Sequence, residues 1–161
     1  VLVTRVGGVT AATDVDGSWV HSCAVVAEGA VLCWGNEDHG ALGRPPRGDN
    51  GPWRVMTSGA TEVRTGDLFA CARMADQTVQ CWGYNAFGQL GDGTFTDRPT
   101  PAPVRINAQS SLSGVVELSV NTRHACARRA DGTVWCWGSD LCGQLGQGQT
   151  CRLARATPVA W

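Results

Sequence analysis

One pattern of residues occurs three times along the 161 residues of this chain, and its copies align without internal gaps. In each copy two cysteines lie ten positions apart, the second is followed by Trp-Gly, and a Gly-x-Leu-Gly turn comes shortly afterwards. A repeat of this kind folds as one supersecondary unit that buries its apolar surface against its neighbours, so it determines the architecture of the whole chain. The copies span residues 21–43, 69–91 and 124–146. We predict a single repeat domain, 1–161, with units at approximately 4–55, 56–104 and 105–161.

Between its two cysteines each copy has the sequence of a β-hairpin. In the first copy, the segment 27–29 (Ala-Glu-Gly) is centred between Cys23 and Cys33 and has glycine where a three-residue loop needs left-handed backbone. The third copy repeats this loop, whereas the second has Gln77 in place of the glycine. Such a loop places the two cysteines directly opposite each other, at a Cα separation of ~4.5–5.5 Å that a disulfide can bridge. The predicted bridges are Cys23–Cys33, Cys71–Cys81, Cys126–Cys136 and, as a local pair outside the repeat, Cys142–Cys151.

The segments that flank each hairpin loop predict strands that are buried on both faces. Residues 24–26 and 31–34 are apolar at consecutive positions, and no part of the chain shows a sustained helical period. Glycine and proline interrupt the chain at short intervals, as in proteins built from many short strands. We therefore predict an all-β protein of small antiparallel sheets stacked face to face, with the leucine of each Gly-x-Leu-Gly turn where two sheets meet.

These residues resemble the repeat of the regulator-of-chromosome-condensation family. Its units carry a Cys-Trp-Gly strand, a Gly-Gln-Leu-Gly turn and a Thr-Pro-x-x-Val strand, which match residues 81–83, 88–91 and 100–104 of the second copy. The first copy departs from the pattern, because Ala41 stands where glutamine is usual. The resemblance implies a β-propeller, usually of seven blades with four strands each, and the cysteine pair is similar to that of the bacterial secreted branch. Three units cannot close a ring, so we expect a piece of a larger, about seven-bladed ring, or copies of the chain that complete one together.

Composition and charge exclude several classes of protein. The chain has 13 basic and 14 acidic residues, a net charge of −1, so general nucleic-acid binding is not expected. No apolar run approaches the ~20 residues that a membrane-spanning helix requires. The eight cysteines form an even count that favours an oxidising compartment. We therefore expect an extracellular, cell-surface or periplasmic protein without a membrane span.

The residues that could ligate a metal or catalyse a reaction have simpler interpretations. The pairs His21/Cys23 and His124/Cys126 have the spacing of metal ligands, but Phe69 occupies the histidine position of the second copy, as expected for a packing position. Cys142 could be a nucleophile with His124 as a distant base, although the disulfide with Cys151 is preferred. Several carboxylates that could meet a cation are interpreted as solvated turn residues: Asp14, Asp16, Glu37, Asp38, Asp49 and Asp140. We expect no catalytic residue, no metal and no cofactor.

Aromatic residues outside the repeat are the candidates for binding a partner. The tryptophans of the Trp-Gly pairs recur in register and are predicted to be core. Trp53 is the first candidate, because the corresponding strand positions of the other copies hold Ala102 and Val159. Exposed aromatics on loops of a rigid scaffold are frequent anchors for protein partners. The complete set of candidates is Trp53, Trp19, Tyr84 and Phe95, with Arg98 in the polar rim.

The function predicted from the sequence is a non-enzymatic, extracytoplasmic scaffold that presents loops on a β-propeller for protein–protein interaction. The alternative is a structural subunit of a surface or filament assembly, and a guanine-nucleotide exchange regulator or an enzyme ranks below both. The family resemblance implies protein partners, since some members act as exchange factors on small GTPases and some secreted members inhibit β-lactamases. The expected partners are an unidentified protein and either the missing propeller blades or copies of the chain itself.

Overall fold

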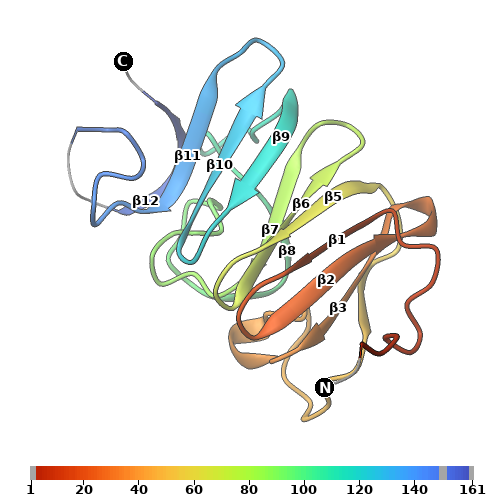
Figure 1. Ribbon diagram of the computed structural model, residues 1–161. Coiled ribbons are helices and arrows are strands. Elements are labelled where there is room, and N and C mark those ends of the chain that lie inside the picture. The colour runs from red at the N-terminus through yellow and green to blue at the C-terminus, as the bar shows by residue number, and fades with distance from the viewer. Residues whose placement is uncertain (1–2, 149–151, 160–161) are drawn as a thin grey trace.

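The chain folds into three four-stranded antiparallel sheets packed in series (Figure 1), in a computed structural model that describes residues 3–148 and 152–159. We call the sheets blades 1, 2 and 3. Two single turns of 3-10 helix, η1 (Ala27–Gly29) and η2 (Asp38–Gly40), lie in the connections of blade 1. Blade 1 has β1 (Asp14–Gly17), β2 (His21–Val26), β3 (Ala30–Gly35) and β4 (Trp53–Met56). Blade 2 has β5 (Ala60–Thr65), β6 (Phe69–Met74), β7 (Val79–Gly83) and β8 (Arg98–Pro103). Blade 3 has β9 (Val115–Val120), β10 (His124–Arg129), β11 (Val134–Ser139) and β12 (Arg152–Pro158). The predicted all-β class is confirmed.

The second and third strands of every blade form the predicted hairpin. Cysteine lies opposite cysteine in each register, the two Cα atoms are 4.1 Å apart, and the disulfides Cys23–Cys33, Cys71–Cys81 and Cys126–Cys136 are present. The left-handed loop position holds glycine in blades 1 and 3, and in blade 2 Gln77 adopts it with φ of 65°. The predicted bridge from Cys142 to Cys151 cannot be placed, because Cys151 lies outside the described residues.

Two tryptophans join neighbouring blades in the same way. Trp82 of blade 2 is fully buried, and its indole Nε1 donates a hydrogen bond to the carbonyl oxygen of Ala41 in blade 1 at 3.1 Å. Trp137 of blade 3 is also fully buried and donates to the carbonyl oxygen of Gln89 in blade 2 at 2.9 Å. Both acceptors belong to Gly-x-Leu-Gly turns, whose leucines are buried in the same junctions. Each junction therefore pairs a blade's tryptophan with the turn of the blade before it.

On the outer face of blade 1, the tryptophan of the repeat is not covered by a neighbouring sheet. Trp34 occupies the same repeat position as Trp82 but is only half-buried. Val26, Ala30 and Leu32 on that face are buried, and Val9 from the N-terminal segment packs against them. The segment before β1 thus covers part of a face that a blade covers in the other two repeats.

His21 occupies a packing position, as predicted from Phe69 at the same place in blade 2. Its residue is 2% exposed, and its Nδ1 lies 3.1 Å from the hydroxyl of Ser18. Burial lowers the pKa of His21 to about 4, although the carboxylates of Asp67 and Asp16 oppose the shift. His21 is therefore neutral in the folded protein at neutral pH.

This burial predicts a loss of stability in mild acid. Below pH 6.5 the unfolded chain protonates His21, whereas the folded chain resists protonation until the pH approaches 4. We expect His21 to reduce the free energy of unfolding by about 2 kcal/mol between pH 8 and pH 5, with the loss complete below about pH 4. Urea unfolding at both pH values should show this loss in the wild type and its removal in His21→Phe. His124, whose pKa is also lowered by burial, should supply the remaining dependence. An unchanged pH dependence in His21→Phe would contradict the assignment.

Candidate protein-binding face

Two sets of loops meet at one end of the three blades. The short loops join the first and second strands of each blade, and the long connections join the third and fourth strands. In every blade, one backbone hydrogen bond of 2.9 Å joins the two sets of loops. Its donor is an N–H at the end of the third strand or just after it, and its acceptor is a carbonyl oxygen of the short loop. The three bonds run from Asn36 to Val20, from Tyr84 to Leu68 and from Ser139 to Arg123. In Figure 1 the long connections lie at the lower left and the hairpin loops at the upper right. We call this surface the loop face: short loops 18–20, 66–68 and 121–123, and connections 36–52, 84–97 and 140–148.

The three short loops enclose a hollow at the loop face. Its volume is about 330 Å³, and each blade contributes to its wall. The lining residues are Ser18, Trp19, Thr65, Gly66, Asp67, Val120, Asn121 and Thr122. The hollow therefore exists only because three segments that are far apart in sequence converge.

The loops of blades 2 and 3 are held against each other in a tight contact. Gly66 packs so closely that an added Cβ would overlap the ring of Phe69 and lie 2.6 Å from the carbonyl oxygen of Asn121. The backbone N–H of Asp67 donates to the carbonyl oxygen of Thr122 at 3.1 Å. This wall of the hollow is thus set by backbone contacts that leave little freedom for side-chain variation.

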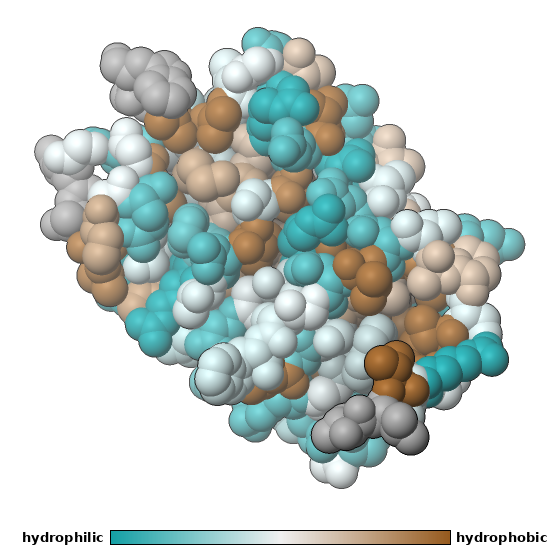
Figure 2. Space-filling model, viewed as in Figure 1, coloured by the Kyte–Doolittle hydropathy of each residue, from teal (hydrophilic) through white to brown (hydrophobic). Residues whose placement is uncertain are grey.

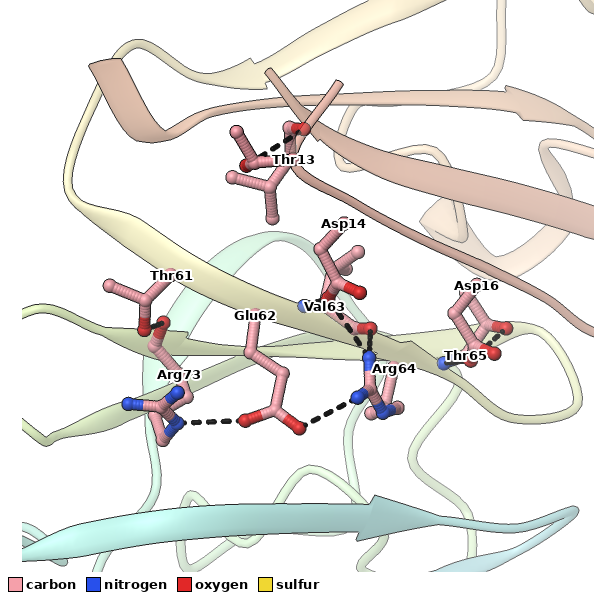
Figure 3. Close-up of polar contacts among 10 residues, drawn as sticks. Thr13, Asp14, Asp16, Thr61, Glu62, Val63, Arg64, Thr65 and Arg73 are labelled. Carbon is pink, nitrogen blue, oxygen red and sulfur yellow. Dashed lines mark hydrogen bonds and ion pairs between the residues drawn. The ribbon is translucent and has the colours of Figure 1, made fainter. Parts of the chain in front are cut away.

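Blade 1 is joined to blade 2 by two carboxylates of β1 (Figure 3). Asp14 Oδ2 accepts hydrogen bonds from the N–H of Val63 at 2.8 Å and from Arg64 Nη1 at 2.9 Å. Asp16 Oδ2 accepts from the N–H and the hydroxyl of Thr65, at 2.7 and 2.9 Å. These carboxylates satisfy N–H groups on the free edge of β5, which would otherwise need water or another strand.

The interpretation of these carboxylates as solvated turn residues was therefore wrong for four of them. Asp14 and Asp16 lie on a strand and bind the next blade, because alternate residues of β1 point across the junction. Glu37 and Asp140 are buried and accept backbone N–H groups of their own long connections, Glu37 from Arg47 and Gly48. Those backbone hydrogen bonds lower the pKa of Glu37.

Trp19 is the predicted candidate that the structure places at the hollow. It is 94% exposed, more than any other aromatic residue among those that the structure describes. It follows Ser18 in the short loop of blade 1 and lines the hollow beside Asp67. A side chain with so much apolar area in water is available for a partner.

Trp53, the first candidate from the sequence, has a different environment. It lies on β4 opposite Cys33, is half-buried, and does not line the hollow. The guanidinium carbons of Arg44 and Arg47 lie 5.0 and 5.1 Å from its ring centroid. The Trp53 ring, predicted from the sequence to bind a partner, is thus occupied by two cation–π contacts within the chain.

The other candidates lie in or beside the long connection of blade 2. The ring of Tyr84 is 4.5 Å from that of His39 in blade 1, and Arg123 from blade 3 stacks over Phe87 at 4.6 Å. The sequence placed His39 and Phe87 at one packing position of the repeat and did not predict these contacts, because they depend on how the blades pack. Phe95 is partly exposed and lies under Arg152 at 4.7 Å. Arg98 is paired with Asp92, with Nε 2.6 Å from the carboxylate.

The side of the molecule seen in Figure 2 has no single broad apolar patch. Its brown apolar residues are separated by polar ones. Leu141 and Cys142 are exposed at the loop face and line a shallow depression of about 340 Å³ that His124 also borders. No hydrogen bond joins the side chains of Cys142 and His124, which were considered as a nucleophile and its base.

Metal-ligating clusters and membrane-spanning helices are both absent from residues 3–148 and 152–159. Within these ranges, no group of three or more His, Cys, Asp or Glu side chains is arranged to hold a metal ion. No helix there has the length and apolar character needed to cross a membrane.

Several solved structures have a similar fold. Human WBSCR16 matches with a TM-score of 0.78 at 20% identity, over 91% of this chain and 39% of that chain. Prp20p from Saccharomyces cerevisiae, studied for its binding to Gsp1p and histones, matches with a TM-score of 0.71 at 19% identity, over 89% and 37%. Yeast RCC1 (Prp20), crystallised with Kap60, matches with a TM-score of 0.70 at 19% identity, over 86% and 35%. The chain spans less than two-fifths of these proteins, and identities this low establish the fold alone.

Comparison with protein families identifies the repeat. The family described as "Regulator of chromosome condensation (RCC1) repeat" matches residues 12–41, 60–89 and 115–144, one match in each blade. A second description of the same repeat matches residues 77–127, across the boundary between blades 2 and 3. These matches cover more than half of the chain and agree with the three sheets of the structure. The chain belongs to the regulator of chromosome condensation (RCC1) repeat family, and its three sheets are blades of a partial β-propeller.

Proposed function

We propose that this chain is a non-enzymatic, extracytoplasmic scaffold that binds a partner protein through its loop face. The observation that carries the proposal is Trp19, an almost fully exposed tryptophan at a hollow built by the short loops of three blades. Tryptophan is enriched among the few residues that dominate protein interfaces, where it enters a pocket and becomes desolvated. No side chain in the described part of the chain stacks on its ring, in contrast to Trp53 between two arginines.

The scaffold itself is suited to hold such a site in place. Three disulfides and two buried tryptophan hydrogen bonds fix the strands from which the loops emerge. A loop that is already ordered loses less entropy when it binds, so a rigid scaffold supports affinity. The disulfides also support an oxidising location, since such bonds persist outside the cytosol. The complexes of yeast Prp20 with proteins are consistent with a protein partner but do not identify this one.

A structural role in an assembly is the second candidate. It is favoured by Trp34, which is half-buried at a position where Trp82 and Trp137 are fully covered by another blade. Further blades or a second copy of the chain would cover it. Capture of proteins on the immobilised chain separates the two roles, because an assembly subunit would capture mainly copies of itself.

The proposal predicts that Trp19→Ala loses the partner without losing stability. Immobilised wild-type chain would be incubated with extracellular and periplasmic extract of the source organism, and bound proteins quantified by mass spectrometry. We expect Trp19→Ala to weaken binding of the captured protein about thirtyfold or more, as for an interface tryptophan that contributes 2 kcal/mol. Its melting temperature should stay within about 2 °C of the wild type, because the side chain is in solvent.

Two matched variants control this experiment. Val15→Ala truncates another exposed apolar residue, on β1, and should leave capture unchanged. Trp53→Ala tests the competing candidate, whose ring is stacked within the chain. Capture that survives in Trp19→Ala and disappears in Trp53→Ala would move the binding surface away from the hollow and refute the proposal.

A further inference from the structure

The hollow at the loop face has one charged side chain in its wall, and that side chain has no ionic partner among the described residues. Asp67 is the only charged residue among the eight that line the hollow. It is partly buried, and its carboxylate forms no hydrogen bond or ion pair with any residue that the structure describes. A carboxylate withdrawn from water without a partner is less stable than a paired one, so a cation that reaches it is bound favourably.

Two arginines that adjoin the lining residues in sequence are engaged elsewhere. Arg64, three residues before Asp67, forms its ion pairs with two other carboxylates. Arg123 stacks its guanidinium over the ring of Phe87. Asp16, bonded to Thr65 in the wall of the hollow, adds a second negative charge. Two carboxylates therefore lie in or beside the wall of the hollow, and no arginine that the structure describes forms an ion pair with either.

The neighbouring indole is suited to the same kind of ligand. Trp19 lies in the wall together with Asp67, and the face of an indole attracts ammonium and guanidinium groups more strongly than other aromatic rings. Ser18, Asn121 and Thr122 add neutral polar side chains to the wall, and these side chains are hydrogen-bonded to His21 or to one another. A volume of about 330 Å³ admits the end of a long side chain.

We propose that the hollow binds a lysine or arginine side chain of the partner protein. The cation pairs with the Asp67 carboxylate, while the Trp19 ring covers the charged group or the alkyl chain that bears it. This inference rests on the proposed function, because it names the chemistry of the partner at the same surface. The repeat itself carries no such site, since the position of Asp67 is occupied by Trp19 in blade 1 and by Thr122 in blade 3.

The test uses two small probes of nearly the same shape, one with a charged guanidinium and the other with a neutral urea group. N-acetyl-arginine methylamide would be titrated into ¹⁵N-tryptophan-labelled chain, and N-acetyl-citrulline methylamide, its neutral isostere, would be titrated in parallel. We expect the arginine probe to shift the Trp19 indole signal with a Kd on the order of millimolar. The citrulline probe should bind up to about fivefold more weakly, as expected for the loss of one partly exposed ion pair. Added salt should weaken only the arginine probe.

Asp67→Asn is the decisive variant, because it removes the charge and keeps the shape of the side chain. The two probes should bind it equally, and its melting temperature should match that of the wild type. Glu117→Gln, which removes an exposed carboxylate outside the hollow, should keep the preference for arginine. Equal binding of both probes to the wild type, or a preference that survives in Asp67→Asn, overturns the inference.

The same variant separates this inference from the proposed function. If partner capture requires Trp19 but is unaffected in Asp67→Asn, the binding face stands and the cationic ligand is wrong. If the arginine probe binds selectively but capture does not require Trp19, the hollow is a cation site and the partner binds elsewhere.

Discussion

Trp82→Ala is expected to lower the free energy of unfolding by about 3–5 kcal/mol. The side chain is fully buried between blades 1 and 2, and its indole nitrogen bonds the carbonyl oxygen of Ala41. Truncation leaves a cavity and an unpaired buried carbonyl group. A loss of this size is a large part of the roughly 5–15 kcal/mol that stabilises a typical domain. Urea unfolding followed by near-ultraviolet circular dichroism would measure it.

Trp34→Ala is the matched control for this prediction. The residue has the same position in the repeat but is half-buried and lacks a blade on its outer side. We expect its truncation to cost less than half as much as that of Trp82. Equal losses would show that the segment containing Val9 supports Trp34 as well as a blade supports the others, contrary to this account.

Reduction of the three disulfides is expected to abolish cooperative folding. Each bridge closes a loop with a separation of ten residues and contributes roughly 2–3 kcal/mol. Together they amount to about 6–9 kcal/mol, within the range of total stability for a domain. The chain unfolded in reductant with its thiols blocked should therefore fail to regain native circular dichroism.

Single-bridge variants make the disulfide prediction quantitative. Replacing both Cys71 and Cys81 by alanine should cost about 2–3 kcal/mol for the lost loop constraint and more for the cavity, because both side chains lie in the core between blades 2 and 3. The same change at Cys126 and Cys136 should cost less, since Cys126 faces the open side of blade 3 and is partly exposed. A fully reduced chain that melts cooperatively near the wild-type temperature would refute the prediction.

Mutations in the blade junctions should lower stability more than mutations at the hollow, because the strands hold the loop face in place. Changes at the blade junctions or the disulfides act on the strands that carry all three short loops. Changes at Trp19 and Asp67 act only on groups in contact with solvent. Binding and stability should therefore be separable by mutation, as expected for a scaffold whose recognition residues are added to a repeated core.

The sequence alone determined the blades. A three-residue hairpin loop sets which residues face each other, so the positions of the cysteines implied the Cys23–Cys33 bridge and its two counterparts. The recurrence of Trp and Leu at fixed offsets likewise implied a core between stacked sheets. These features were predictable because hairpin pairing is local, and because a position repeated three times must serve a need that every blade shares.

Only the tertiary structure decided which non-repeating residues meet. From the sequence, Trp53 was a stronger candidate than Trp19, and Asp14 and Asp16 were assigned to solvent. The packing of β1 against β5 turned those carboxylates into links between blades, and stacking by Arg44 and Arg47 occupied Trp53. The hollow with Trp19 and Asp67 needs loops from three blades, and their approach depends on the angle and spacing of whole sheets. No local pattern encodes that geometry, because it results from the sum of many weak contacts across the blade junctions.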